Sequence, residues 1–286
     1  KRIKELEGDI IKLKTLLEYS QQHGDISVNP TDPDSRRMRN HGKKEAAFNV
    51  QIAVDAAHNL IAGDEVLQDC NDLNAMRPVL DNLENELDVI PDKVVMDNGY
   101  NNVKALIEVE QNTDKNIDLY VVVDTVSPNQ KAERQLSKWD FTYDSDTDTY
   151  VCPAGQRLKR RGNAHKNKKR LLTKYYCPLS VCKECEYYAR CVKGKEGRTV
   201  MRYTDEAWSE EFRNRMRSDS AQALLKKRKS IIEHVFGTLK RWMGYQPLLL
   251  RGLTKVRTEI SLYTIAYNLR RLVTLGFTSQ WVKQTF

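Results

Sequence analysis

A short apolar run ends in a single carboxylate at Lys93-Val94-Val95-Met96-Asp97-Asn98-Gly99-Tyr100. Its apolar part predicts a strand that is buried on both faces, as in a sheet covered by helices. Asp97 then lies where the strand ends, beside a turn at Gly99, and ligands often bind at such strand ends. Two interpretations of Asp97 stay open on these residues alone: a cap for the turn, or a ligand for a metal ion.

The segments around this strand predict an α/β fold. Residues 48–67 alternate apolar and polar side chains on either side of a turn, which predicts an antiparallel hairpin. Residues 1–20, 71–87 and 103–111 have apolar side chains at helical spacing, and 119–123 is a second short apolar strand. Strands that alternate with helices after a hairpin indicate a mixed sheet flanked by helices.

Composition and turn signals divide the chain into four parts. Of its 286 residues, 40% are hydrophobic and 30% are charged, which suits one large domain or a core with an insertion. We assign residues 1–40 to a helix and linker, 41–134 to the first part of the core, and 223–286 to helices that complete it. Residues 135–222 are basic and rich in cysteine and turn signals, which predicts an inserted subdomain, with regular helices resuming only near Ser220.

Charge and hydropathy indicate a cytoplasmic protein that binds a polyanion. No apolar run approaches the roughly 18 residues of a membrane span, and the charged first residues are unlike a signal peptide. Residues 1–150 carry 17 Lys and Arg against 29 Asp and Glu, whereas residues 151–286 carry 30 against 10. The basic half favours DNA or RNA, because Lys and Arg release counterions from phosphates. An ordinary solvated basic surface is the alternative.

A second carboxylate stands on a cationic helix at Ile231-Ile232-Glu233-His234-Val235-Phe236-Gly237-Thr238-Leu239-Lys240. Helical geometry places Glu233 on one face with Lys226, Lys229 and Lys240, opposite an apolar face. Phosphodiester chemistry by two Mg²⁺ ions requires carboxylates that hold both ions. Asp97 and Glu233 could therefore form a divided metal site, while a solvated helix face with i, i+4 ion pairs would have the same pattern.

These segments, together with Asn49-Val-Gln-Ile-Ala-Val-Asp55 and Asn268-Leu-Arg, resemble the DDE transposases of bacterial insertion sequences over roughly residues 30–275. The resemblance implies an RNase H-like mixed sheet with Asp, Asp and Glu on the first strand, the fourth strand and a late helix, and an insertion before that helix. Asp97 matches the second Asp and Glu233 the Glu. It further implies Mg²⁺ or Mn²⁺, double-stranded DNA as transposon ends and target, a homodimer on DNA, and a place in the bacterial nucleoid.

The chain departs from the family pattern at two points. In the late-helix signature Tyr-x2-Arg-x3-Glu-x6-Lys, Lys240 matches the final Lys, but Lys226 and Lys229 hold the Tyr and Arg positions and Arg228 is one residue out of register. We expect all four cations to bind DNA phosphates.

The first Asp of the family pattern has no clear counterpart. Asp32, Asp34 and Asp55 are poor substitutes because they lie in a loop or in the hairpin's turn. We therefore expect a transposase truncated at its amino-terminal end. An inactive DNA-binding remnant and a metal-dependent nuclease on the same fold are the alternatives.

Five of the six cysteines fall in the predicted insertion, where Cys182-x2-Cys185 has the spacing of a zinc knuckle. Disulfides are not expected in a cytoplasmic protein. Cys177, Cys182, Cys185 and Cys191 are the candidate ligands for structural Zn²⁺, with Cys152 able to replace one of them. A set of reduced, metal-free thiols is the alternative.

Overall fold

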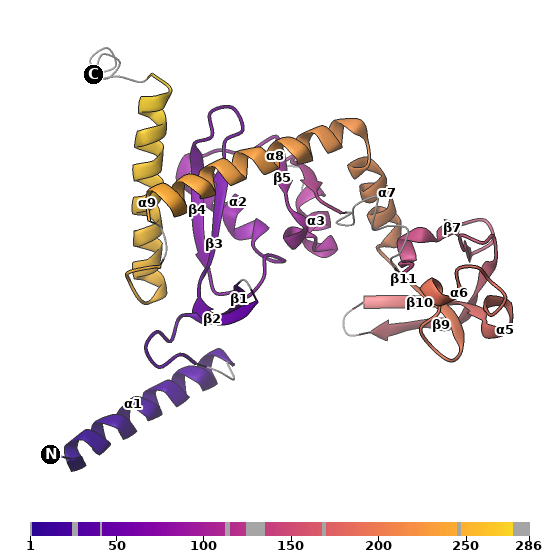
Figure 1. Ribbon diagram of the computed structural model, residues 1–286, viewed down its shortest axis with the longest axis horizontal. Helices are drawn as coiled ribbons and strands as arrows, with labels where there is room; N and C mark the ends of the chain where they lie inside the picture. Colours follow the sequence, from indigo (N-terminus) through magenta and orange to yellow (C-terminus); the bar gives the residue numbers. More distant parts are fainter. Residues whose placement is uncertain are drawn as a thin grey trace. The chain divides into compact units, whose positions relative to one another are not determined.

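The computed structural model divides the chain into two compact units (Figure 1). It describes residues 2–24, 28–40, 42–111, 115–123, 135–167, 170–244 and 247–276. The first unit comprises Lys1–Val123 and Ser218–Phe286, and the second comprises Asp124–Arg217. The predicted boundary at residues 134 and 135 adjoins 124–134, which lie outside the described residues. That the second unit is an insertion into an RNase H-like core stays a prediction.

The strands of the first unit form three separate pairs. β1 (Arg36–Asn40) and β2 (Lys43–Ala47) form a hairpin that the sequence did not predict. β3 (Asn49–Val54) pairs with β4 (Ile61–Leu67) in the predicted antiparallel hairpin, and β5 (Lys93–Met96) pairs with β6 (Asp118–Val121) in parallel. The prediction of one mixed sheet is corrected here. Among the described residues no strand joins β3 to β5, so the antiparallel and parallel pairs share no hydrogen-bond ladder.

The helices of the first unit largely follow the sequence periodicity. Those before the second unit are α1 (Arg2–His23), α2 (Met76–Leu87), the 3₁₀ turn η1 (Asn98–Tyr100) and α3 (Val103–Glu110). Those after it are α8 (Asp219–Gly237), the π-helical turn η3 (Thr238–Trp242) and α9 (Leu253–Thr274). α2 begins five residues later than predicted, because residues 71–75 form a turn in which the Ala75 N–H donates to the Asp72 carbonyl at 3.0 Å. No helix among the described residues is long and apolar enough to cross a membrane.

α8 connects the two strand pairs of the first unit. It packs on β5 and β6 (Figure 1). Further along the helix, Val235 is fully buried in the same hydrophobic cluster as Val66 of β4. α9 completes this core, where the Asn268 side chain accepts from the Ile61 N–H at 2.9 Å and donates to the Ile61 carbonyl at 2.8 Å. The amide of Asn268 thus satisfies both backbone groups where the β3–β4 ladder shifts register.

The second unit contains an antiparallel five-stranded sheet in the order β11-β10-β9-β8-β7. Its elements are η2 (Lys138–Asp140), β7 (Thr142–Asp144), β8 (Thr149–Val151), β9 (Arg157–Asn167), β10 (Arg170–Pro178), α5 (Leu179–Cys182), α6 (Tyr188–Cys191), β11 (Gly197–Tyr203) and α7 (Glu206–Met216). The expectation that regular helices resume only near Ser220 was therefore wrong. The sequence did not predict this sheet because β9 is rich in cations and mostly exposed, so it lacks the alternation of apolar and polar residues that marks a half-buried strand.

Candidate active site

Asp97 lies directly after β5, with extended backbone dihedrals. Its Oδ1 accepts from the Gly99 N–H at 2.8 Å. The turn-cap interpretation therefore accounts for the Oδ1 atom of Asp97 and not for its second oxygen. Among the described residues the other oxygen makes no hydrogen bond, so the capping role does not exclude metal binding.

A second carboxylate, which the sequence reasoning missed, stands beside Asp97. The Oδ1 of Asp72 accepts from the side-chain amides of Asn49 and Gln51, each at 2.8 Å. A Cβ placed on Gly99 would lie 2.8 Å from Asp72 Oδ2 and 3.0 Å from Asp97 Oδ1, closer than Cβ atoms approach such atoms. Both carboxylates therefore border Gly99, and a larger residue there would require at least one of them to move.

Tyr100 connects the strand pair β3–β4 to this carboxylate pair. Its hydroxyl donates to Gln51 Oε1 on β3. Burial raises the pKa of the Tyr100 hydroxyl above its ordinary value, Asp72 and Asp97 raise it further, and Arg228 acts in the opposite direction. Arg228 of α8 therefore acts on the pKa of the same phenol as the two carboxylates do.

Arg228 is the cation that α8 turns inward. Its side chain is partly buried, and its Nε is buried without a hydrogen-bond partner. Lys226 and Lys229, which hold the Tyr and Arg positions of the family signature, are exposed. Arg228, which is out of register with the family signature, is thus less exposed than Lys226 and Lys229, and the motif spacing could not reveal this.

The structure does not bring Glu233 to Asp97 within the described parts of the chain. Glu233 is 68% exposed, and its Oε1 lies 3.8 Å from Lys229 Nζ in an i, i+4 pair. At about 100° per residue, Glu233 lies roughly 140° around the helix from Arg228 and so points elsewhere. Lys240 is also exposed, with its Nζ 5.2 Å from the centre of the Phe236 ring. No three acidic, His or Cys side chains that the structure describes form a metal-holding group.

The other acidic residues that we weighed serve the backbone. Asp32 and Asp34 accept from the N–H groups of Gly252 and Leu253 at 3.1 and 2.8 Å, and so cap the start of α9. Asp55 accepts from the N–H groups of Ala57 and His58 in the β3–β4 turn. Each of the three carboxylates therefore has a hydrogen-bonding role that requires no metal ion.

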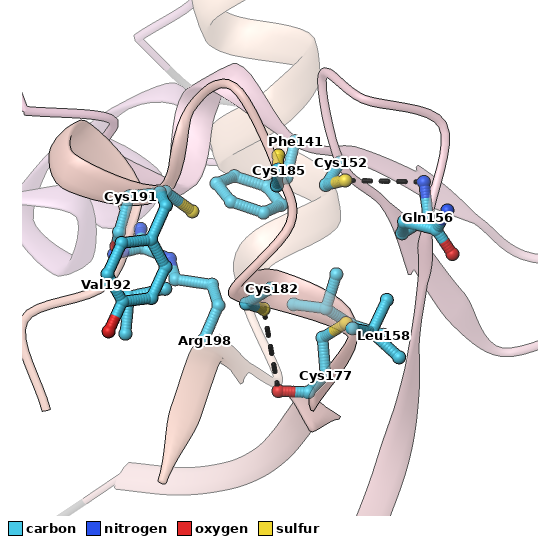
Figure 2. A pocket seen from close by; sticks show the side chains of 12 residues that line it. Phe141, Cys152, Gln156, Leu158, Cys177, Cys182, Cys185, Cys191, Val192 and Arg198 are labelled. Carbon is cyan, nitrogen blue, oxygen red and sulfur yellow. Dashed lines mark hydrogen bonds between the residues drawn. The ribbon is translucent and has the colours of Figure 1, made fainter. Parts of the chain in front are cut away.

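The candidate zinc ligands lie together in the second unit. Cys152, Cys177, Cys182, Cys185 and Cys191 are all free thiols and line one pocket (Figure 2). Burial raises the pKa of the Cys177 thiol to about 12, and the adjacent Cys182 thiol contributes to the rise. The sequence thus predicted that these cysteines lie together. It gave Cys152 only as a possible replacement for one of the other four, whereas Cys152 lines the same pocket as they do.

Comparison with known proteins agrees with the resemblance. Residues 151–273 match the family model of the transposase DDE domain, which confirms that the chain resembles a DDE transposase and supports a transposase-type function. No curated protein and no solved structure matches the chain. The matched segment includes Glu233 and the cysteine cluster, whereas Asp72 and Asp97 precede it.

Proposed function

We propose that the chain is part of a transposase that cleaves DNA at the ends of an insertion sequence and joins them to target DNA. The observation that carries this proposal is the pair of carboxylates, Asp72 and Asp97, that borders Gly99 at the end of β5. Two like charges at one place repel each other, and a divalent cation removes that repulsion. The match of residues 151–273 to the transposase DDE domain supports the transposase class, whereas the use of Asp72 and Asp97 rests on their geometry alone.

The donor atoms fit Mg²⁺ or Mn²⁺, because both ions prefer carboxylate oxygens. Asp72 and Asp97 would hold the ion, and Arg228 would contact the phosphate. When bound, the ions activate the attacking water or 3′-hydroxyl and stabilise the leaving oxygen. The residues themselves position the ion, since the amides of Asn49 and Gln51 fix the orientation of Asp72.

Glu233 is the third proposed ligand, although it lies on the exposed side of α8. Its ion pair with Lys229 is solvent-exposed on both sides. Exposed pairs contribute only about 0.2–1 kcal/mol, so this pair opposes a rearrangement very little. Bringing Glu233 to Asp97 would also require α8 to turn, because Glu233 lies roughly 140° around the helix from Arg228.

The first carboxylate of the family pattern has a natural place between β3 and β5. Each of these strands is paired on one edge only among the described residues. Gln51 of β3 reaches Tyr100 just after β5, so β3 rather than β4 lies toward that strand. A strand entering there would complete the mixed sheet, and we propose that such a strand carries the missing Asp.

The cations that could contact DNA differ in whether a carboxylate already pairs with them. In the second unit, Arg157, Arg160 and Arg161 of β9 are each paired with a carboxylate. Lys226 and Lys227 of α8 are exposed and make no ion pair among the described residues. We therefore expect α8 to contribute more to the salt dependence of DNA binding than the three arginines do.

The test is incubation of the purified chain with plasmid DNA and Mg²⁺ or Mn²⁺, followed by analysis of nicked and joined products. Activity should disappear in Asp97→Asn and fall in Asp72→Asn, and it should persist in Asp81→Asn, an exposed aspartate of α2 paired with Arg77. Joined products identify a transposase. Nicked products alone indicate the nuclease alternative, and equal activity of Asp97→Asn would refute the site.

A non-catalytic DNA-binding remnant is the second candidate. The exposed, Lys229-paired position of Glu233 favours it. It predicts DNA affinity that is the same with and without Mg²⁺ and is unchanged by Asp97→Asn. A DNA affinity that rises with Mg²⁺ only when Asp97 is present would exclude it.

A further inference from the structure

Five of the chain's six cysteines converge on one pocket of the second unit, although they come from different elements (Figure 2). Cys152 follows β8, Cys177 is on β10, Cys182 ends α5, Cys185 is in the next turn and Cys191 ends α6. Cys177, Cys182 and Cys191 are buried, and the other two are partly buried. Chance placement of reduced thiols does not explain a convergence from two turns, two helices and a strand.

The backbone around these thiols has features of a thiolate metal site. The Gln156 N–H donates to Cys152 Sγ at 3.3 Å, and the Gly155 N–H donates to the Cys152 carbonyl at 2.8 Å, which closes a turn over that sulfur. The Cys185 N–H donates to the Cys182 carbonyl at 3.1 Å, so the Cys182-x2-Cys185 segment is itself a turn. Hydrogen bonds to sulfur and ligand-bearing turns are what hold metal ligands in place.

A partly buried cation in the pocket wall, Arg198, has no anionic partner among the residues that the structure describes. Arg198 donates from Nη1 to the Cys191 carbonyl and from Nη2 to the Leu136 carbonyl, each at 3.0 Å. Its Nε is buried and has no hydrogen-bond partner, and no carboxylate pairs with it among the described residues. A buried charge requires compensation. Neutral thiols do not supply a negative charge, whereas thiolates bound to a metal ion do.

We propose that Cys152, Cys182, Cys185 and Cys191 bind one structural Zn²⁺ ion, with Arg198 compensating the negative charge of the tetrathiolate. Four Zn–S bonds form, and the four thiol protons pass to water. The electrostatic neighbours of Cys191 include the other three thiols of this set. Cys177 is excluded because it is fixed in the β10–β11 ladder opposite Arg198, whereas the other four lie outside the strands.

Zinc binding requires only local movement. The described residues contain no three thiols already in coordinating geometry. The four proposed ligands lie in turns or at the ends of four-residue helices, where side chains and backbone can shift inward. Helices this short are not stable alone, so the ion would hold α5 and α6 against the sheet.

The experiment uses the purified full chain and measures its metal content. Mass spectrometry of metals should find about one zinc per chain, and Co²⁺ exchanged into the site should give the absorption bands of a tetrahedral thiolate complex. Each of Cys152→Ser, Cys182→Ser, Cys185→Ser and Cys191→Ser should lose most of the zinc and the cobalt bands. Cys70→Ser, an exposed thiol of the first unit, and Cys177→Ala should keep both.

Several results would overturn the proposal. Metal-free protein whose second unit is folded, as judged by its sheet signal in circular dichroism, would remove the site. Disulfides among the five cysteines in protein purified under reducing conditions would do the same. If Cys177→Ala lost its zinc and Cys152→Ser retained it, Cys177 rather than Cys152 would be a ligand, and the proposed set would be wrong. These outcomes are independent of the plasmid assay, because all proposed ligands lie outside the first unit.

Discussion

Replacing Gly99 by alanine should compress the two carboxylates at the end of β5. Gly99 does not have a positive φ, so its backbone accepts an alanine without strain. The added methyl group would meet Asp72 Oδ2 at 2.8 Å and Asp97 Oδ1 at 3.0 Å. One of the two side chains must therefore rotate away, and we expect Asp72 to move because Asp97 caps the turn.

The expected loss of stability follows from what Asp72 gives up. Its hydrogen bonds from Asn49 and Gln51 are both 2.8 Å long, and hydrogen bonds to a charged group contribute about 1.5–3 kcal/mol each. Asp72 is only partly buried, so water replaces much of that interaction. We expect Gly99→Ala to lower the free energy of unfolding of the first unit by about 1–2 kcal/mol, within the usual range for overpacking.

Urea unfolding followed by hydrogen exchange of peptides from β3 and α8 measures this free energy for the first unit alone. Gly237→Ala is the matched control, because Gly237 is in helical conformation at the end of α8 with nothing within 4 Å of an added Cβ. That control should gain about 0.5–1 kcal/mol. Asp72→Ala should reduce the effect of Gly99→Ala. An equal gain in both glycine variants, or no coupling to Asp72, would refute the crowding.

Two further predictions concern buried and hydrogen-bonded carboxylates. Glu259 is buried and accepts from the loop N–H groups of Leu249 and Leu250 at 2.9 and 2.8 Å. In urea unfolding, Glu259→Ala should lower the free energy of unfolding by about 2–3 kcal/mol and Glu259→Gln by less than half of that. Equal losses would contradict this role. Hydrogen bonds from Tyr175 and Tyr143 lower the pKa of Asp148, so the second unit should lose stability as pH falls below the unfolded value near about 4. Asp148→Asn keeps the left-handed turn and should reduce this acid-side slope without abolishing it, because the hydrogen bond from Arg157 also lowers the pKa of Asp144 in the same unit. An unchanged slope would contradict the assignment.

Local pattern predicted the elements of the first unit better than their pairing. The hairpin of β3 and β4 and the short strands β5 and β6 have the period and composition of strands. Pairing depends on hydrogen bonds between segments far apart in sequence, which no local period encodes. The division between β3 and β5 could not be read from the sequence for this reason.

The candidate site was predictable in part. Asp97 has a strand before it and a glycine after it, and both features are visible in the sequence. Asp72 gives no such signal, because it begins a turn that the helical spacing of 71–87 concealed. Arg228 was interpreted from its position in the family signature, where it is one residue out of register. Its orientation depends instead on which face of α8 packs on β5. Glu233 depends on the same choice of face, which turns it away.

Two departures from the expected fold occur at one place and have one physical explanation. Within the described ranges, no strand joins β3 to β5, and no third acidic, His or Cys side chain completes a metal-holding group with the carboxylate pair. β3 carries Gln51, which contacts Asp72 and Tyr100, while β5 leads directly into Asp97. A strand paired with both free edges would satisfy their backbone groups and would bring one of its side chains beside both carboxylates. We therefore infer that restoring a single strand would complete the sheet and the metal site together.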